Sequence, residues 1–198
     1  MAAALASAIG NRVRRERQSR RWTLDQLADS AGVSRRMLVN VEQGTANPSI
    51  GILLKLSDAL GVGLPALVEP PVRASIQITK NGDGAVLWQS PTGGRAVLVA
   101  GTTPPNVVEL WDWTLGAGDH YRSTPHTPGT TELIHLHHGA ITVEVADDSV
   151  HLSPGDAVTF RGDLPHAYIN TSPTPANFSL TVFEPGVGHQ LRSESEHA

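Results

Sequence analysis

Hydrophobic residues follow two different periods along the chain, and the change comes near residue 70. Before it they recur at helical spacing, and Leu5, Ile9 and Val13 share one face of a helix that we predict over residues 4–19. After it, short alternating or β-branched runs are separated by Gly, Pro and Asp, which is typical of strands. The pattern therefore predicts an all-α domain followed by an all-β domain.

Capping residues indicate four further short helices before the change. Thr23 is an N-cap candidate with Gln26 as its capping-box partner, and Gly32 follows as a stop. The remaining predicted boundaries are Ser34 and Gly44 for the third helix, Pro48, Ser49 and Gly61 for the fourth, and residues 64–68 for a fifth. Two short helices joined by a tight turn that contains glycine form a helix-turn-helix arrangement.

The strand-like runs favour an all-β sandwich or barrel in the second domain. These runs are 85–89, 96–100, 107–115, 132–137, 140–146, 150–152, 157–160 and 178–183. The proline-rich segment 69–75 breaks the chain, because its prolines neither continue a helix nor donate to a sheet. We therefore expect domains at 1–68 and 76–188, joined by this linker, and a flexible tail over 189–198.

Charge and composition suggest that the two domains have different partners. Residues 1–70 hold 9 Lys and Arg against 6 Asp and Glu, whereas residues 71–198 hold 6 against 13 and all 9 histidines. The lack of cysteine excludes a disulfide framework, a thiolate metal site and a cysteine nucleophile. No apolar run approaches the roughly 20 residues of a membrane span. The N-terminus lacks the order of a signal peptide, so we expect a cytoplasmic protein with no membrane partner.

The first domain resembles a known DNA-binding family. The segment TLDQLADSAGVSRRMLVNVEQG over 23–44, followed by NPSIGILLKLSDALGV, is similar to the phage-repressor-like (XRE, Cro-type) domain. The match covers roughly residues 8–68 and includes Leu27, Ala28, Gly32, Val33, Ser34, Glu42, Gly44, Pro48, Ser49, Ala59 and Leu60. The resemblance implies a five-helix domain of a transcriptional regulator that binds a double-stranded DNA operator.

The second helix of the pair should carry the base-reading residues. Arginine can bridge two acceptors of guanine and asparagine can pair with adenine. The candidates on its outer side are Arg35, Arg36 and Asn40 for hydrogen bonds, and Met37 and Val39 for thymine methyl groups. Val33, Leu38 and Val41 should face the core.

Other residues of this domain are candidates for anchoring and support. Contacts to phosphates position a protein on DNA without specifying sequence, and we assign them to Arg12, Arg14, Thr23 and Asn47. Arg17 and Glu42 match a family ion pair that holds the first helix against the recognition helix. Leu24 stands where many family members carry a glutamine that touches the DNA backbone.

The second domain contains two histidine-bearing stretches, GDHYRSTPHTPGTTELIHLHHGAITVEV over 118–145 and LSPGDAVTFRGDLPHAYIN over 152–170. Together they resemble the two motifs of the cupin superfamily, across about residues 105–185. The second motif keeps Gly155, Asp156, His166 and Asn170, and departs at Arg161 and Asp163. In the first, Glu132 and Gly139 fit and His126 takes the second histidine position, but Thr124 replaces the first histidine. The resemblance implies a double-stranded β-helix, or jelly-roll, barrel.

Three metal ligands of such a barrel remain, namely His126, Glu132 and His166. Two imidazoles and a carboxylate suit a divalent metal with open positions, such as Zn or Fe. His120 could replace the missing imidazole. A metal-free pocket, in which these groups hydrogen-bond a small effector or one another, is slightly favoured over a metal site. His135 and His137 should point away from the side of Glu132. Trp111 and Trp113 are more typical of core or interface residues.

The combined pattern favours a DNA-binding transcriptional regulator whose barrel senses a small-molecule effector. One helix-turn-helix domain contacts half a site, so we expect a homodimer on a pseudo-palindrome. The competing classes are a cupin isomerase or dioxygenase with an accessory DNA-binding head, and a DNA-binding protein whose barrel only dimerises. Loss of the imidazole at Thr124 argues against an enzyme.

Overall fold

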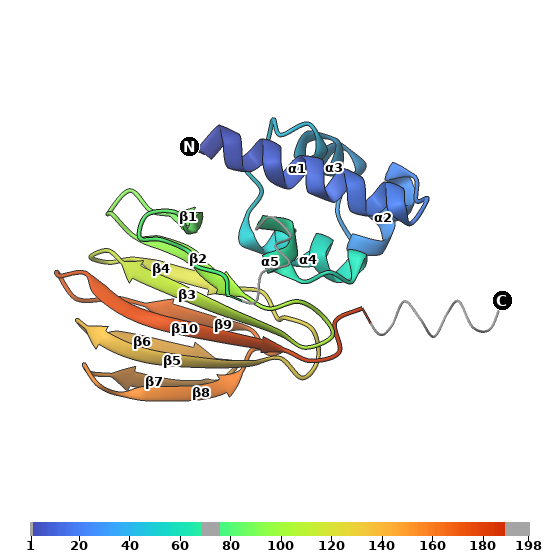
Figure 1. Ribbon diagram of the computed structural model, residues 1–198. Coiled ribbons are helices and arrows are strands. Elements are labelled where there is room, and N and C mark those ends of the chain that lie inside the picture. Colours follow the sequence, from blue (N-terminus) through green and yellow to red (C-terminus); the bar gives the residue numbers. More distant parts are fainter. Residues whose placement is uncertain (1, 69–75, 189–198) are drawn as a thin grey trace. The chain divides into compact units, whose positions relative to one another are not determined.

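The computed structural model describes residues 2–68 and 76–188 (Figure 1). The proposed linker over 69–75 and the proposed tail over 189–198 lie outside the described residues. The chain divides into two compact units, a helical unit that contains all five helices and a strand unit of residues 79–102 and 106–185.

The helical unit contains α1 (Ala2–Ser19), α2 (Leu24–Ala31), α3 (Arg35–Glu42), α4 (Ile50–Leu60) and α5 (Leu64–Val68). Their ends follow local chemistry that the sequence had indicated. The Thr23 hydroxyl accepts a hydrogen bond from the Gln26 amide and the Gln26 side chain accepts one from the Thr23 amide, which completes the capping box. Gly32 and Gly61 end α2 and α4 in the left-handed conformation that glycine adopts without a steric penalty.

The core of the helical unit is aliphatic. It buries Ile9 and Val13 of α1, Leu27 of α2, and Leu38 and Val41 of α3. From α4 and α5 it adds Leu53, Leu56, Leu60, Leu64 and Leu67, each at most 1% exposed. In this arrangement α3 packs against α1, and α2 packs against α3 and α4 (Figure 1).

The strand unit contains two antiparallel sheets (Figure 1). The six-stranded sheet has the order β1 (Ala85–Gln89), β2 (Arg95–Gly101), β3 (Val107–Leu115), β10 (Ala176–Glu184), β5 (Thr131–His138) and β8 (Ala157–Arg161). The four-stranded sheet has the order β4 (His120–Ser123), β9 (His166–Ile169), β6 (Ile141–Val145) and β7 (Asp148–Leu152). After β3 the chain changes sheet at every connection except the one between β6 and β7, which pair with each other, and this gives the jelly-roll connectivity.

Aromatic rings fill the space between the two sheets. Trp113 of β3 stacks on Phe178 of β10, with centroids 5.8 Å apart and planes 7° from parallel. Tyr168 of β9 meets Trp113 edge-on at 5.5 Å, so the core joins both sheets. Because β5 alternates buried and exposed residues from Glu132 onwards, the same interior also receives a carboxylate.

Candidate functional site

The surface of α3 presents polar side chains above a buried inner side. Arg35 and Arg36 are exposed. The other base-readout candidates, Met37, Val39 and Asn40, are half-buried, as is Val33, which we had placed in the core. Arg35 forms an ion pair with Asp25 at 2.8 Å, but both side chains are more than half exposed. Such surface pairs contribute little, so Arg35 can exchange Asp25 for another partner at small cost.

A nearly buried ion pair fixes α3 against α1. The Arg17 guanidinium donates to both oxygens of Glu42, at 2.6 and 2.8 Å, and to the Trp22 carbonyl at 2.9 Å. The hydrogen bond to Glu42 raises the pKa of Arg17. The two helices approach so closely that a Cβ at Gly10 would overlap with the Val41 carbonyl oxygen. The Arg17–Glu42 ion pair therefore holds α1 against α3, as the resemblance to the family had implied.

The residues proposed to contact phosphates differ in their exposure to solvent. Arg14, Thr23 and Asn47 are exposed. Arg12 is half-buried and donates to the Ala66 carbonyl of α5 at 2.9 Å, and burial lowers its pKa. Arg12 therefore has a structural contact that its sequence position did not indicate.

The strand unit brings three proposed metal ligands together. His126 lies before β5, Glu132 on β5 and His166 at the start of β9, and their ligand atoms all lie within 4.8 Å of one another. The Glu132 Oε1 atom is 2.9 Å from His126 Nε2 and 3.2 Å from His166 Nε2. All three side chains are at most 8% exposed.

The chemistry of this cluster fits a divalent cation. The atoms Glu132 Oε1 and His166 Nε2 are buried, and neither makes a contact with the geometry of a hydrogen bond to a protein group. His166 Nδ1 lies 2.8 Å from the Leu164 carbonyl, so a proton on Nδ1 leaves the Nε2 lone pair directed at the cluster. Two imidazoles and a carboxylate that meet at buried lone pairs could therefore hold a metal.

The cluster also has a marked electrostatic character. Burial alone would raise the pKa of Glu132, but the two histidines lower it to about 2. Burial opposes a charge on His126 as well, yet Glu132, Glu184 and Glu109 raise its pKa. The site therefore stabilises positive charge beside Glu132, whether on imidazole or on a cation.

Two families match separate parts of the chain. The helix-turn-helix family HTH_3 matches residues 13–67, and the cupin domain family Cupin_2 matches residues 111–183. Residues 13–67 are thus similar to a helix-turn-helix domain, and residues 111–183 are similar to a cupin domain. This confirms the predicted fold class of a five-helix DNA-binding-type domain followed by a cupin barrel.

Proteins with similar sequences include named regulators. The chain is 25% identical over 181 residues to the HTH-type transcriptional regulator SutR of Escherichia coli, covering 91% of this chain and 97% of SutR. It is 37% identical over 60 residues to the immunity repressor protein of Bacillus phage phi105, covering 30% of this chain and 42% of that protein. A crystal structure of an HTH_3 family transcriptional regulator from Vibrio cholerae shares the fold, with a TM-score of 0.72 and 24% identity over 93% of this chain and 99% of that one.

The cupin domain buries acidic residues that sequence reasoning missed. Glu109 of β3 and Glu184 of β10 are each 1% exposed, and His126 Nδ1 lies 3.9 Å from Glu184. Burial and the nearby Glu184 raise the pKa of Glu109 to about 8. Tyr168 donates a hydrogen bond to Glu132 Oε2. The sequence did contain a signal for the burial of Glu109. It lies two residues before Trp111 and four before Trp113, so all three side chains lie on the buried face of β3.

The other candidates of the cupin domain lie elsewhere. His120 is exposed on β4 and does not belong to the cluster found among the described residues, so it does not replace the missing imidazole. His135 and His137 are exposed on β5, as predicted, with their rings 4.7 Å apart. Trp111 and Trp113 are buried core residues. Among the described residues, no helix combines the length and apolar character that crossing a membrane requires.

Proposed function

We propose that this protein is a DNA-binding transcriptional regulator whose cupin domain senses a small molecule. The observation that carries the proposal is the surface of α3, where Arg35 and Arg36 are exposed above a buried inner side. A recognition helix needs such side chains to reach base edges in the major groove. The ion pair of Arg17 with Glu42 holds this helix rigidly against α1, which limits the entropy lost on binding.

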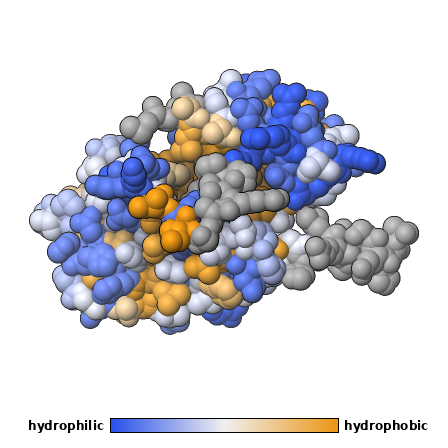
Figure 2. Space-filling view, viewed as in Figure 1, coloured by the Kyte–Doolittle hydropathy of each residue, from blue (hydrophilic) through white to orange (hydrophobic). Residues whose placement is uncertain are grey.

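Sequence readout is assigned to α3 and anchoring to the residues around it. Arg35, Arg36 and Asn40 would hydrogen-bond base edges, and Met37 and Val39 would contact thymine methyl groups. The phosphate contacts are assigned to Arg14, Thr23, Asn47 and, beside its bond to Ala66, Arg12. Strongly hydrophilic residues gather around α2 and the C-terminal end of α1 in Figure 2. The basic residues among them belong to α1 and the turn after it, where Arg14, Arg15 and Arg21 are exposed, and these favour a polyanionic partner.

Selection of DNA from a random duplex pool tests the proposal. The full-length protein should enrich a pseudo-palindrome whose half-sites lie about one helical turn apart. The selected duplex should bind far more tightly than a scrambled one at the same salt concentration. If the pool shows no enrichment and binding is equal for all sequences, the protein is not a sequence-specific regulator.

A homodimer would present two recognition helices to such a site, and an apolar sheet face offers the contact. Leu110 and Leu133 flank Thr181 in register on the outer face of the six-stranded sheet, and Phe183 lies two residues further along β10. The three apolar side chains are 43%, 44% and 36% exposed. Their directly paired cross-strand neighbours carry no charge, so like charges would not oppose contact at these positions.

The buried cluster is the proposed sensor site. His126, Glu132 and His166 would hold a divalent metal such as Zn or Fe, and a metal there would supply open positions for oxygen or nitrogen atoms of an effector. Without metal, the same groups would hydrogen-bond an organic effector directly. In either form, the effector acts only if it binds one DNA-binding state of the protein more tightly than the other.

Metal analysis separates these two forms. Protein purified without chelator should carry about one equivalent of metal per chain, and Glu132→Ala should lose it, if the cluster is a metal centre. His135→Ala is the matched control, because this exposed histidine of β5 points away from the cluster. A metal-free wild-type protein would leave only the organic-effector form.

A cupin metalloenzyme of the isomerase or dioxygenase type is the second candidate. It is favoured by the three converging ligands, which leave coordination positions open. Thr124, which stands at the position of the fourth ligand, is exposed and offers no imidazole. Metal binding without sequence-selective DNA binding would favour the enzyme over the regulator.

A further inference from the structure

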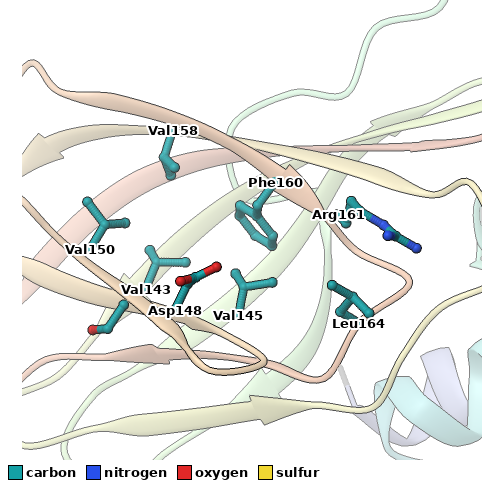
Figure 3. Close-up of a pocket in the computed structure, with 9 residues that line it drawn as sticks. Val143, Val145, Asp148, Val150, Val158, Phe160, Arg161 and Leu164 are labelled. Carbon is teal, nitrogen blue, oxygen red and sulfur yellow. The ribbon is translucent and has the colours of Figure 1, made fainter.

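A second site lies at the open edge of the barrel, and none of the three proposed metal ligands lines it. A pocket of about 290 Å³ opens between β6, β7 and β8, where the edge strands of the two sheets come together (Figure 3). Its walls are aliphatic and aromatic, formed by Val143, Val145, Val150, Val158, Phe160 and Leu164. The size suits a compact organic molecule with an apolar body.

The two charged side chains of the pocket differ in whether they can bind a ligand. The Asp148 carboxylate points toward the ring of Phe160, between Val143 and Val145 (Figure 3). The Arg161 guanidinium points away from this space and forms two hydrogen bonds with Asp163, at 2.9 and 3.2 Å. The charge of Arg161 is therefore balanced locally, and the charge presented to the pocket is negative.

We propose that this pocket binds a small organic cation, a primary amine carried on an apolar body. The ammonium group would pair with Asp148, and the ring face of Phe160 would add a cation–π contact. The valines would cover the apolar body and exclude water from it. This inference goes beyond the proposed sensor site at the buried cluster, because it adds a second effector site and names the chemical class of its ligand.

The pocket is connected to the buried cluster through one side chain. The Phe160 ring lies 5.5 Å from the His166 ring and 6.4 Å from the Tyr168 ring, between centroids. Val145 also pairs with His166 across β6 and β9. A ligand that displaces Phe160 therefore moves a residue in contact with the cluster, which gives the two sites a packed route for coupling.

Binding of three matched probes to the full chain tests the inference by calorimetry. 2-Phenylethylamine, 2-phenylethanol and phenylacetate share an aromatic body and differ in charge. We expect 2-phenylethylamine to bind most tightly and phenylacetate most weakly. Asp148→Asn should lower the affinity for the amine about fivefold and leave the affinity for the alcohol unchanged, since only the amine loses an ion pair.

Two further variants locate the site. Asp147→Asn removes the neighbouring exposed carboxylate, which does not line the pocket, and should leave all affinities unchanged. Val150→Trp fills the pocket from a side chain that is 41% exposed, and should abolish binding while the circular dichroism spectrum stays that of the wild type.

The inference is wrong if the wild type does not bind 2-phenylethylamine, if phenylacetate binds as tightly, or if Asp148→Asn leaves the amine affinity unchanged. These outcomes do not depend on DNA. A protein that selects its operator but fails here keeps its role as regulator and loses only this effector class. If the protein binds the amine but no specific DNA sequence, the proposed amine pocket stands and the proposed role as a regulator is wrong.

Discussion

Arg36 and Arg14 carry the same charge but have different expected roles on DNA. Arg36 is exposed on α3, where it can reach base edges, so Arg36→Ala should remove discrimination at one base position of each half-site. The variant should lose about 1–3 kcal/mol of binding free energy on the preferred sequence and less on duplexes with another base at that position. Competition binding with duplexes altered at single positions measures this effect.

The complementary variant is Arg14→Ala, on the exposed side of α1. A lost phosphate contact should weaken all sequences alike and reduce the slope of log affinity against log salt by about one. Arg95→Ala, an exposed arginine of the cupin domain, is the control and should change neither quantity. Identical effects of Arg36→Ala and Arg14→Ala would mean that readout and anchoring are assigned to the wrong residues.

The buried carboxyl of Glu109 makes the stability of the cupin domain depend on pH. Its pKa is raised from an ordinary 4.5 to about 8, so the folded protein keeps a proton that the unfolded chain has released. Since the folded state binds more protons over this range, wild-type stability should fall as pH rises from about 4.5 to about 8.

Glu109→Gln removes this dependence while keeping the shape of the side chain and an oxygen for the Trp111 indole. The variant should therefore gain stability relative to the wild type as pH rises, by at most about 1.4 kcal/mol per pH unit. Urea unfolding at pH 5 and pH 8, followed by tryptophan fluorescence, measures the difference. Equal pH dependence of the two proteins would contradict a protonated Glu109.

Single residues also show where sequence reasoning stops. His126, Glu132 and His166 could be named because their spacing along the chain resembles a known motif, and the fold brings them within 4.8 Å of one another. Glu184 has no such spacing. It joins the site because β10 pairs with β3 and places it near Glu109, a proximity that depends on strand register across the sheet.

At the scale of elements, the contact between α1 and α3 can be tested at one glycine. Gly10→Ala should favour α1 by about 1 kcal/mol from helix propensity alone. However, the added methyl group would overlap with the Val41 carbonyl, and relieving that overlap should cost about 1–3 kcal/mol. We expect net destabilisation and weaker DNA binding, because α3 must shift.

Asn11→Ala is the control for this variant, since Asn11 is the next residue of α1 and its side chain is exposed. It should leave both stability and DNA affinity close to the wild type. Thermal unfolding and binding to the selected duplex measure the two quantities. A more stable Gly10→Ala variant would show that propensity outweighs the contact and that the helices do not approach as closely as described.

Helices and strands differed in how well the sequence predicted them. The five helices begin and end at or within two residues of the predicted positions, because Thr23, Ser34 and Ser49 cap them locally. The short strands β4 and β9 were missed. Each has four residues, and the polar sequence of β4 has no alternating pattern. Pairing defines them, because β4 pairs with β9 and β9 also pairs with β6.

At the scale of the whole molecule, two separate signals indicated two modules. The switch of hydrophobic period and the reversal of charge both occur near residue 70, and the two families match on opposite sides of it. The assembly of two chains was expected only from the need to contact two half-sites. The apolar face that could mediate it becomes visible when register places Leu110 and Leu133 on either side of Thr181.

Leu133→Glu tests whether this face joins two copies. The side chain is 44% exposed, so the chain should still fold, but two buried carboxylates would face each other in a dimer. We expect the wild type to sediment as a dimer and the variant as a monomer. The variant should bind a duplex with one half-site normally, but its affinity for a duplex with two half-sites should fall strongly. Val86→Glu on β1, at 39% exposure, is the control and should stay dimeric. A dimeric Leu133→Glu protein would place the contact on another surface.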